Sequence, residues 1–313
     1  MRVTQSMLSS NMLRNLNTSY NKMSKLQDQM NSGKLVNRPS DDPVIAVKGM
    51  GYRVDLDKNA QFQRNINEAH TWTDTTDEAL DQVGTSLIRV KELIVQAAND
   101  TNTTEDRQKI SVEISQIREQ MKDMANTKIG DNYIFSGTNT NSPLYDANNV
   151  NPVTGQNAAL TEDGVKNSIT INVFDGIAIQ VNVQGNEYFK EIDDFMGQLE
   201  TILNNGATGA EISAALGATI ADNTGMTTIP ALDAIHAKTL TMRAEVGARQ
   251  NRLELMENRL EIQEVNVTKQ LSESEDTDYS KAITDMATTE SIHQAALSVG
   301  AKIIQQTLVD FIR

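Results

Sequence analysis

The sequence predicts a mainly α-helical fold with a β-containing insert. Both chain ends are expected to form an elongated rod of long antiparallel helices, and the insert is expected to form an outer α+β domain. Apolar residues recur in five long runs at alternating spacings of four and three, the pattern of a helix face or coiled-coil seam. Between the third and fourth runs the spacing becomes two, as in strands. Only 4% of residues are aromatic, which suits aliphatic helix seams better than a large β-sandwich.

The first helix is expected over about residues 4–31. It carries an apolar seam with Ser19 as its one polar member, formed by Met12, Leu16, Met23, Leu26 and Met30. Gly33 is expected to end this helix in a left-handed conformation, with Lys34 at the negative end of the helix dipole.

The stretch SGKLVNRPSDDP, residues 32–43, is predicted to join the first helix to the second. Pro39 should hold Arg38 in an extended conformation. Ser40 is the expected N-cap of the second helix, which would place Asp41 and Asp42 in its first turn, near the positive end of the dipole.

Two rod helices are expected within residues 50–128. Their seams are Leu80, Val83, Leu87, Val90, Ile94 and Ala97, then Ile110, Ile114, Ile117, Met121 and Met124. The polar stretch 99–104 separates them, and Thr103 or Thr104 can cap the second of the two. Gly130 is expected to end it.

The insert follows, and its strongest signal is a hairpin. Two alternating runs, 169–173 and 177–183, flank Asp175-Gly176, a pair typical of a tight hairpin turn. Residues 133–135 form a short β-like run and residues 137–166 read as loops. Residues 191–217 predict short helices that break at 204–206.

A long return helix is expected over about 230–270, followed by SESEDTDY, residues 272–279. This acidic stretch is interpreted as a charged hinge that caps the last helix, with Glu275, Asp276 and Asp278 as its hinge and capping residues. The last helix, about 279–312, carries two apolar seams. They are Ile292, Ala296, Val299 and Ile303, then Leu297, Ala301, Ile304, Leu308 and Phe311.

These signals divide the chain into five segments: 1–36, 37–136, 137–228, 229–271 and 272–313. The first and last are interpreted as assembly helices because each has an apolar face to bury, and a lone helix is marginal in water. Two alternatives remain open: the ends pack only on each other within one monomer, or they also pack on neighbouring subunits.

Composition and motifs argue against nucleic-acid binding, membrane attachment and a cofactor or metal site. A formal charge of −14 argues against nucleic-acid binding and against electrostatic membrane attachment. No apolar run reaches the length of a membrane span, no classical signal peptide is expected, and there are no cysteines. No cofactor or metal site is expected, since Gly33-Lys34 fails the phosphate-loop pattern, 272–279 fails the EF-hand pattern and the three histidines lack zinc-site spacing.

An enzyme remains the least favoured alternative. Asp41-Asp42 would be adjacent at a helix start, where the two carboxylates do not face each other. The insert holds one further acidic doublet, Asp193-Asp194, without a nucleophile or a Gly-rich pocket.

The paired chain ends resemble those of bacterial flagellins and flagellin-like axial proteins. The first helix running into SGKLVNRPSDDP is similar to their N-terminal region. VGARQNRLE at 246–254, SESEDTDYSKAITDM and the Ala-rich last helix ending in FIR are similar to their C-terminal region. The likeness covers about two-thirds of the chain. The loop RPSDDP and the stretch DNYIFSGT at 131–138 resemble the family members that join the flagellar hook to the filament, whereas the insert, 139–228, shows no recognisable motif.

The resemblance implies a structural role and a set of partners. The expected function is a hook–filament junction built by helix packing of the terminal regions, and the alternative is flagellin itself. The implied partners are hook-associated protein 1 on the hook side, flagellin on the filament side, copies of this chain in a ring, and a flagellar export chaperone before secretion. Export by the flagellar type III apparatus without a cleaved signal, and an extracellular location in the flagellum, are implied in the same way.

Overall fold

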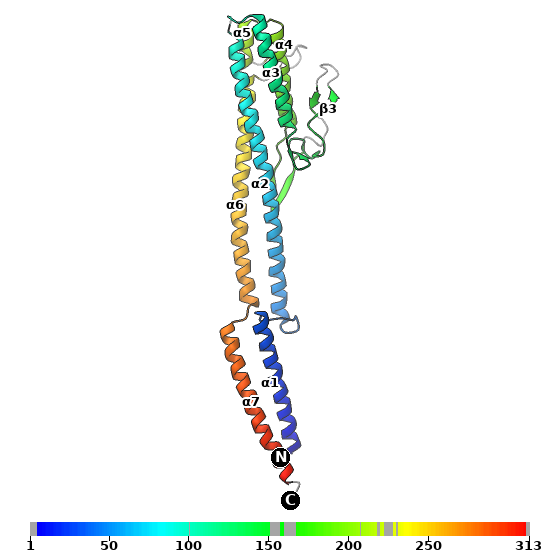
Figure 1. Ribbon diagram of the computed structural model, residues 1–313, viewed down its shortest axis with the longest axis vertical. Coiled ribbons are helices and arrows are strands. Elements are labelled where there is room, and N and C mark those ends of the chain that lie inside the picture. Colours follow the sequence, from blue (N-terminus) through cyan, green and yellow to red (C-terminus); the bar gives the residue numbers. More distant parts are fainter. Residues whose placement is uncertain are drawn as a thin grey trace. The chain divides into compact units, whose positions relative to one another are not determined.

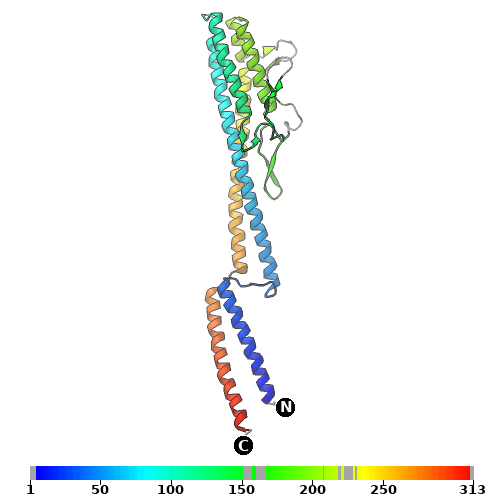
Figure 2. The same cartoon turned by 45° about the vertical axis from the view of Figure 1, so that its right-hand side comes forward.

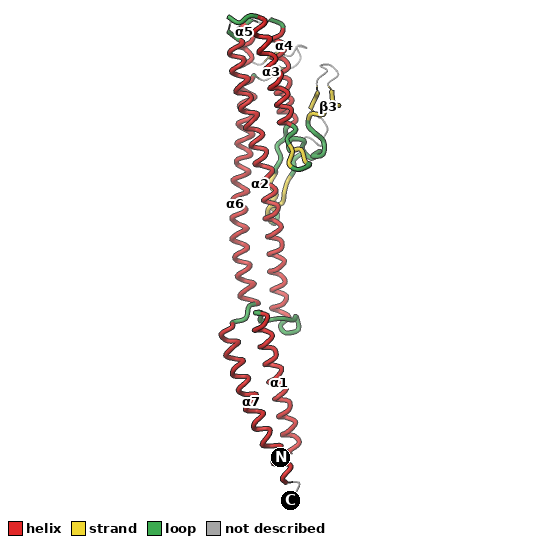
Figure 3. The backbone as a smooth tube through the Cα atoms, in the orientation of Figure 1, coloured by secondary structure: helices red, strands yellow, loops and turns green. Residues whose placement is uncertain are grey.

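The computed structural model describes residues 5–99, 101–150, 157–159, 167–206, 208–217, 220–221, 228–229 and 231–310. The chain divides into two compact units, Met1–Ala60 with Glu261–Arg313, and Gln61–Leu260. Helices make up most of the described chain (Figure 3). The two longest helices, α2 (Pro43–Ala97) and α6 (Leu232–Glu275), contribute residues to both units, and each unit is described by itself.

The first unit is built from both chain ends. It contains α1 (Gln5–Ser32), α7 (Tyr279–Asp310), the first part of α2 and the last part of α6. The blue α1 and the red α7 lie side by side in both views (Figures 1 and 2). Gly33 has a positive φ of 70° directly after α1, so the predicted helix end is confirmed.

The start of α2 differs from the prediction. Ser40 does not cap it: Asp42 does, since its carboxylate accepts hydrogen bonds from the backbone N–H of Val44 (2.9 Å) and Ile45 (3.1 Å). Asp41 lies in the preceding turn, where its carboxylate accepts from the N–H of Arg38 at 3.2 Å. Neither Asp41 nor Asp42 is therefore in the first helical turn. Pro43 occupies that position, where its missing N–H costs no hydrogen bond.

The second unit has an aliphatic core that matches the predicted rod seams. All six residues of the seam in α2 and all five of the seam in α3 (Thr104–Ala125) are buried. The long return helix α6 adds buried Ile235, Val246, Leu253 and Leu260 to this core. Thr103 caps α3, because its hydroxyl accepts from the N–H of Asp106. Two further helices, α4 (Asn186–Asn204) and α5 (Gly209–Gly217), break where the sequence predicts.

Four two-stranded antiparallel hairpins complete the described part of the second unit. They are β1 (Lys128–Ile129) with β2 (Asn132–Tyr133), β3 (Tyr145–Val150) with β4 (Asn157–Ala159), β5 (Thr170–Phe174) with β6 (Ile177–Gln180), and β7 (Ile220–Ala221) with β8 (Thr228–Ile229). The hairpin at Asp175-Gly176 is thus confirmed, with Gly176 at a φ of 73°.

Two predictions, one at the end of α3 and one in the insert, were wrong. Gly130 does not end α3, which stops at Ala125 with Asn126 as its C-cap; its positive φ of 59° serves the β1–β2 turn instead. The region 137–166 is not loop throughout, since it contains β3 and β4. The sequence of β3, YDANNV, is too polar to show a clear alternation, which is why the pattern missed it.

The β5–β6 hairpin is fastened to the long helices by one aromatic residue. Phe174 stacks on Phe62 of α2 with ring centroids 6.1 Å apart, and the Arg259 guanidinium of α6 lies 4.2 Å from the Phe174 ring centroid. The Asn65 side-chain amide also donates to the carbonyl of Asn172 at 2.7 Å. The hairpin therefore contacts both α2 and α6.

Candidate assembly surface of the terminal helices

The helices α1 and α7 pack antiparallel in a defined register. Met12 lies against Gly300 so closely that a methyl group added to this glycine would overlap its side chain. At the other end of the pair, the Tyr279 hydroxyl lies 3.0 Å from the position that a Cβ on Gly33 would take. Both contacts fit the same antiparallel alignment, so the register holds along the pair.

The middle of this pair contains a polar layer. The register places Ser19 opposite His293, and the ring centroids of Tyr20 and His293 are 6.2 Å apart. The Ser19 hydroxyl and the His293 Nδ1 atom are both buried without a hydrogen-bond partner. Neither atom is paired with another described protein group, so this layer contributes no hydrogen bond from these two atoms that would hold α1 and α7 together.

The predicted seam of α1 faces α7, but it is thinly covered. Only Leu26 is buried, at 9% exposed, and the other four members are partly buried: Met12, Leu16, Met23 and Met30. One leucine at this level of burial is little apolar burial for the five residues of the seam, all of which the structure describes.

The face that α7 turns toward α1 differs from both predicted seams. Its buried and partly buried positions follow the 4–3 spacing through mostly small or polar residues: Ala282, Met286, Thr289, His293, Ala296 and Gly300. Of the predicted residues whose side chains the structure describes, only Ala296 belongs to this row. The signal that could have found it is the repeat of residues such as Ala282, Thr289 and Ala296 at intervals of seven.

The large apolar residues of α7 point outward instead. Ile292, Leu297 and Val299 are 58%, 48% and 55% exposed, and Ala301 is exposed as well. Ile303, Ile304 and Leu308 lie on α7, but their side chains fall outside what the structure describes, and Phe311 lies outside the described residues.

Other apolar residues of the first unit are exposed as well. They are Met7, Leu13 and Tyr20 on α1, Val44, Val47, Met50 and Val54 on α2, Ile262 and Val265 on α6, and Ile283 on α7. Scattered exposed apolar residues are ordinary, but so many on so few helices are typical of an interaction surface.

The two predicted hinges meet at one joint. The backbone of Lys34 pairs with that of Asp276 as an isolated antiparallel bridge, and Asp278 caps α7 by accepting from the N–H of Ser280 (3.0 Å) and Lys281 (3.2 Å). Arg38 and Pro39 are exposed in the turn before α2. Glu275 ends α6 and is buried, a position that its charge did not predict.

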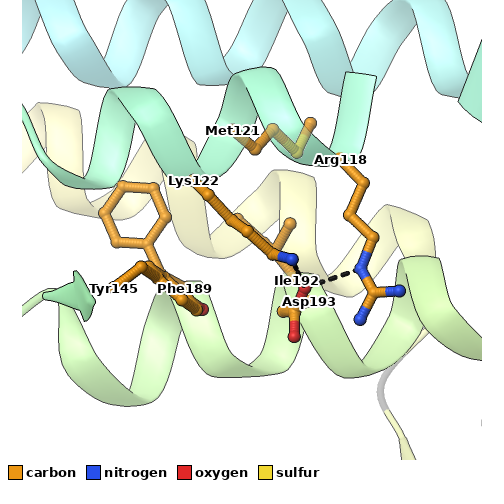
Figure 4. A pocket seen from close by; sticks show the side chains of 7 residues that line it. All are labelled: Arg118, Met121, Lys122, Tyr145, Phe189, Ile192 and Asp193. Carbon is orange, nitrogen blue, oxygen red and sulfur yellow. Dashed lines mark hydrogen bonds and ion pairs between the residues drawn. The ribbon is translucent and has the colours of Figure 1, made fainter. Parts of the chain in front are cut away.

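The acidic doublet of the insert forms part of a structural ion-pair cluster between α3 and α4 (Figure 4). Arg118 donates from Nε to Asp193 at 2.6 Å and from a terminal nitrogen to Glu200 at 3.2 Å. Lys122 lies 3.6 Å from the same Asp193 oxygen. The adjoining cavity of about 10 Å³, also lined by Tyr145, holds one water molecule at most. Asp193 is therefore committed to ion pairs in a space that admits no substrate.

Burial sets the protonation behaviour of this cluster. It raises the pKa of Glu200 by more than the charge and hydrogen bond of Arg118 lower it. For Arg118, burial alone would lower the pKa, but the hydrogen bond and charge of Asp193, together with Glu200, raise it overall. Burial also raises the pKa of Tyr145, so its hydroxyl stays protonated. The pKa of Arg118 and that of Tyr145 therefore both lie further from neutral pH than usual, so neither group is suited to acid–base catalysis there.

Two further searches of the described residues bear on function. None of the described helices combines the length and apolarity that crossing a membrane requires. Among the same residues, no group of three or more His, Cys, Asp or Glu side chains could hold a metal ion.

Comparison with known proteins agrees with this architecture. Residues 3–140 match the bacterial flagellin N-terminal helical region, and residues 229–312 match the bacterial flagellin C-terminal helical region. Flagellar hook-associated protein 3 of Escherichia coli is 27% identical, covering 94% of this chain and 93% of that protein. A flagellin of Bacillus subtilis is 26% identical, covering 98% of this chain and 97% of that protein.

A solved structure shares the fold. The flagellar junction protein FlgL from Legionella pneumophila superposes with a TM-score of 0.55 at 15% identity, covering 73% of this chain and 99% of that one. The two family matches together span well over half of the sequence and take in both terminal helices and most of the long rod helices. The chain therefore belongs to the bacterial flagellin family of flagellar structural proteins, which are not enzymes.

Proposed function

We propose that this protein forms the junction between the flagellar hook and the filament. The observation that carries the proposal is the exposure of apolar residues from both predicted seams of α7: Ile292 and Val299 of one and Leu297 of the other are about half exposed or more. Support comes from the similarity to hook-associated protein 3 along 94% of the chain, and from the fold shared with a flagellar junction protein.

The proposed mechanism is helix packing between subunits. Among the side chains that the structure describes, α1 and α7 bury little apolar surface on each other, while burial of a full Leu or Ile side chain is worth about 1.5–3 kcal/mol. Covering the exposed rows against neighbouring subunits supplies the stabilisation that the pair lacks in the monomer. In this mechanism the two chain ends pack on each other within one subunit and also pack on neighbouring subunits.

The five sequence segments take roles in this assembly. We assign 1–36 and 272–313 to an inner layer of assembly helices, 37–136 and 229–271 to a middle layer of rod helices, and 137–228 to an outer domain. In this arrangement the insert contributes little to assembly, so its deletion should leave the junction intact.

The partners follow from the position of a junction. They are hook-associated protein 1 on the hook side, flagellin on the filament side and further copies of this chain in a ring. Before assembly, the subunit would be held by a flagellar export chaperone and secreted by the flagellar type III apparatus, which places it outside the cell in the flagellum.

A deletion strain tests the proposal. Cells that lack this protein should still secrete flagellin but release it into the medium, because the filament has no base on which to polymerise. Complementation with the full chain should restore filaments, and complementation with a chain lacking the insert should do so too. A deletion strain that still builds full-length filaments would refute the junction role.

Flagellin itself is the second candidate, favoured by the 26% identity to Bacillus subtilis flagellin over nearly the whole chain. The two roles differ in copy number. Purified flagellin should extend into long filaments by itself, whereas a junction protein should stop at short rings or remain monomeric. Quantifying the protein per flagellum from isolated flagella separates the two in cells.

A further inference from the structure

The apolar packing of α3 and α4 in the second unit does not by itself define how the two helices are aligned. The buried apolar residues of α3 recur at intervals of three and four, and those of α4 recur in a similar way. On α4 they are Phe189, Ile192, Phe195, Met196, Leu199 and Leu203. Apolar attraction is not directional, so a slide of one helical turn, about 5.4 Å, would again bring apolar residues together.

A buried guanidinium interrupts this apolar packing. Only 6% of the Arg118 side chain is exposed, and it donates to Asp193 at 2.6 Å and to Glu200 at 3.2 Å. Lys122, one turn further along α3, also lies close to Asp193, and Figure 4 shows both cations directed at this carboxylate. The charged contacts therefore join particular positions of α3 to particular positions of α4.

A gap on α4 receives the guanidinium. Gly197 lies between Asp193 and Glu200 on one face of α4, at spacings of four and three. A Cβ atom at Gly197 would come within 3.1 Å and 3.2 Å of the two terminal nitrogens of Arg118. The positions one turn away on this face, Asp193 and Thr201, both carry side chains, so the face offers no equivalent gap in either adjacent turn.

The same two helices hold strands of the insert. Asn126, the C-cap of α3, binds the backbone of Tyr145 twice: its amide donates to the carbonyl at 2.8 Å, and its oxygen accepts from the N–H at 2.9 Å. Tyr145 begins β3, and α4 begins at Asn186, shortly after β6. The alignment of α3 with α4 therefore sets the spacing between the two points at which this part of the insert meets the helices.

We propose that Arg118 is a positioning residue that selects one register of α3 against α4, and so fixes where the strands of the insert attach. A slide of one turn would move the guanidinium off Gly197 and onto a side chain, and would leave Glu200 buried without its cation, which is strongly unfavourable. All of these residues belong to the second unit, and the inference does not depend on the junction role.

The test measures the distance between two spin labels in the isolated full-length chain. The chain has no cysteine, so Gln108→Cys on α3 and Lys190→Cys on α4 introduce the only two labelling sites, and both positions are exposed. Double electron–electron resonance should give one narrow distance distribution in the otherwise unchanged protein.

The decisive variant combines Arg118→Met with Glu200→Met. It removes the guanidinium together with the carboxylate that would be stranded, while Asp193 keeps Lys122 at 3.6 Å. Replacing buried ion pairs with apolar residues of similar volume is often neutral or stabilising, so the denaturant midpoint should stay the same or rise. The distance distribution should nevertheless broaden, or gain a second population displaced by about 5 Å. A contact that only stabilised the fold would lower the midpoint and leave the distance unchanged.

Two single variants sharpen the result. Glu191→Gln is the matched control, because Glu191 also lies on α4 and pairs with Lys238 of α6 at 2.8 Å, but both side chains are partly exposed. It should keep the narrow distribution. Gly197→Leu keeps every charge but fills the gap, so it should shift or broaden the distribution as the double variant does.

Three outcomes would overturn the proposal. A broad distribution in the protein with native Arg118 and Glu200 would show that the register is not fixed. An unchanged narrow distribution in the double variant, or an equal broadening in Glu191→Gln, would show that the guanidinium does not select it. If the double variant failed to fold, an unchanged distribution in Gly197→Leu would still refute the proposal.

Discussion

Replacing Ile292 and Val299 with glutamate should block assembly and leave the monomer folded. The two residues lie seven apart on one face of α7 and are 58% and 55% exposed. Full burial of such a side chain is worth about 1.5–3 kcal/mol, and a little over half of that surface is left to bury, which gives about 1 kcal/mol for each residue. Losing about 2 kcal/mol weakens each subunit contact by about 30-fold. The cost of desolvating two carboxylates in the new interface adds several kcal/mol.

The assay compares stability with assembly. Because both side chains are exposed in the monomer, the free energy of unfolding should change by less than about 0.5 kcal/mol. Complementation of a deletion strain should fail, with flagellin found in the medium and few filaments on the cells. Gln294→Glu, an exposed polar position on the same helix, is the control and should complement. Normal filaments in the double variant would refute the assignment of this face to assembly, and a large loss of monomer stability would show that the face is already covered.

Three more predictions address packing and charge. Gly300→Leu should drive Met12 out of the α1–α7 seam and speed amide exchange in α1, whereas leucine at Gly247, which has open space, should not. Arg118→Ala should destabilise the second unit by about 3 kcal/mol in denaturant unfolding, because it removes a charged partner from the largely buried Glu200 and Asp193, of which Asp193 keeps Lys122. Burial raises the pKa of Glu200 above its usual 4.5, so the folded state binds this proton more tightly than the unfolded state does. The contribution of Glu200 to the free energy of unfolding should therefore fall as the pH rises through its folded-state pKa. Glu200→Gln, measured by denaturant unfolding at several pH values, should reduce that fall.

The middle of the chain could be predicted because its local patterns agree with its packing. In α2 and α3 the residues with 4–3 spacing are those that the structure buries, so periodicity alone identified the core. The hairpin at Asp175-Gly176 follows from the same agreement, since turn chemistry and alternation pointed to one register. Where several local signals support the same helix or hairpin, the tertiary contacts favour the same structure, so the prediction from sequence holds.

The start of α2 could not be placed from the N-cap preferences of single residues. Ser40, Asp41 and Asp42 are all good N-cap residues, and propensity cannot choose among neighbours. The choice depends on Pro43, which fits the first helical position and leaves Asp42 as the residue before it. The same limit applies to Asp193, whose partners Arg118 and Lys122 lie on α3, far away in sequence. A doublet of carboxylates looks the same in sequence whether it is free or paired.

The spacing of apolar residues in α7 did not predict which face of this helix packs against α1. In a monomeric two-helix pair, large side chains would face the partner helix, because that burial is the main source of stability. Here α7 does the opposite: it turns Ala282, Ala296 and Gly300 toward α1 and leaves Ile292 and Leu297 outside. Small residues let α1 approach closely while the larger apolar side chains remain free for other contacts. Over the side chains of α7 that the structure describes, the larger apolar residues are therefore available to partners outside the chain, and this arrangement favours assembly as the state that the sequence stabilises.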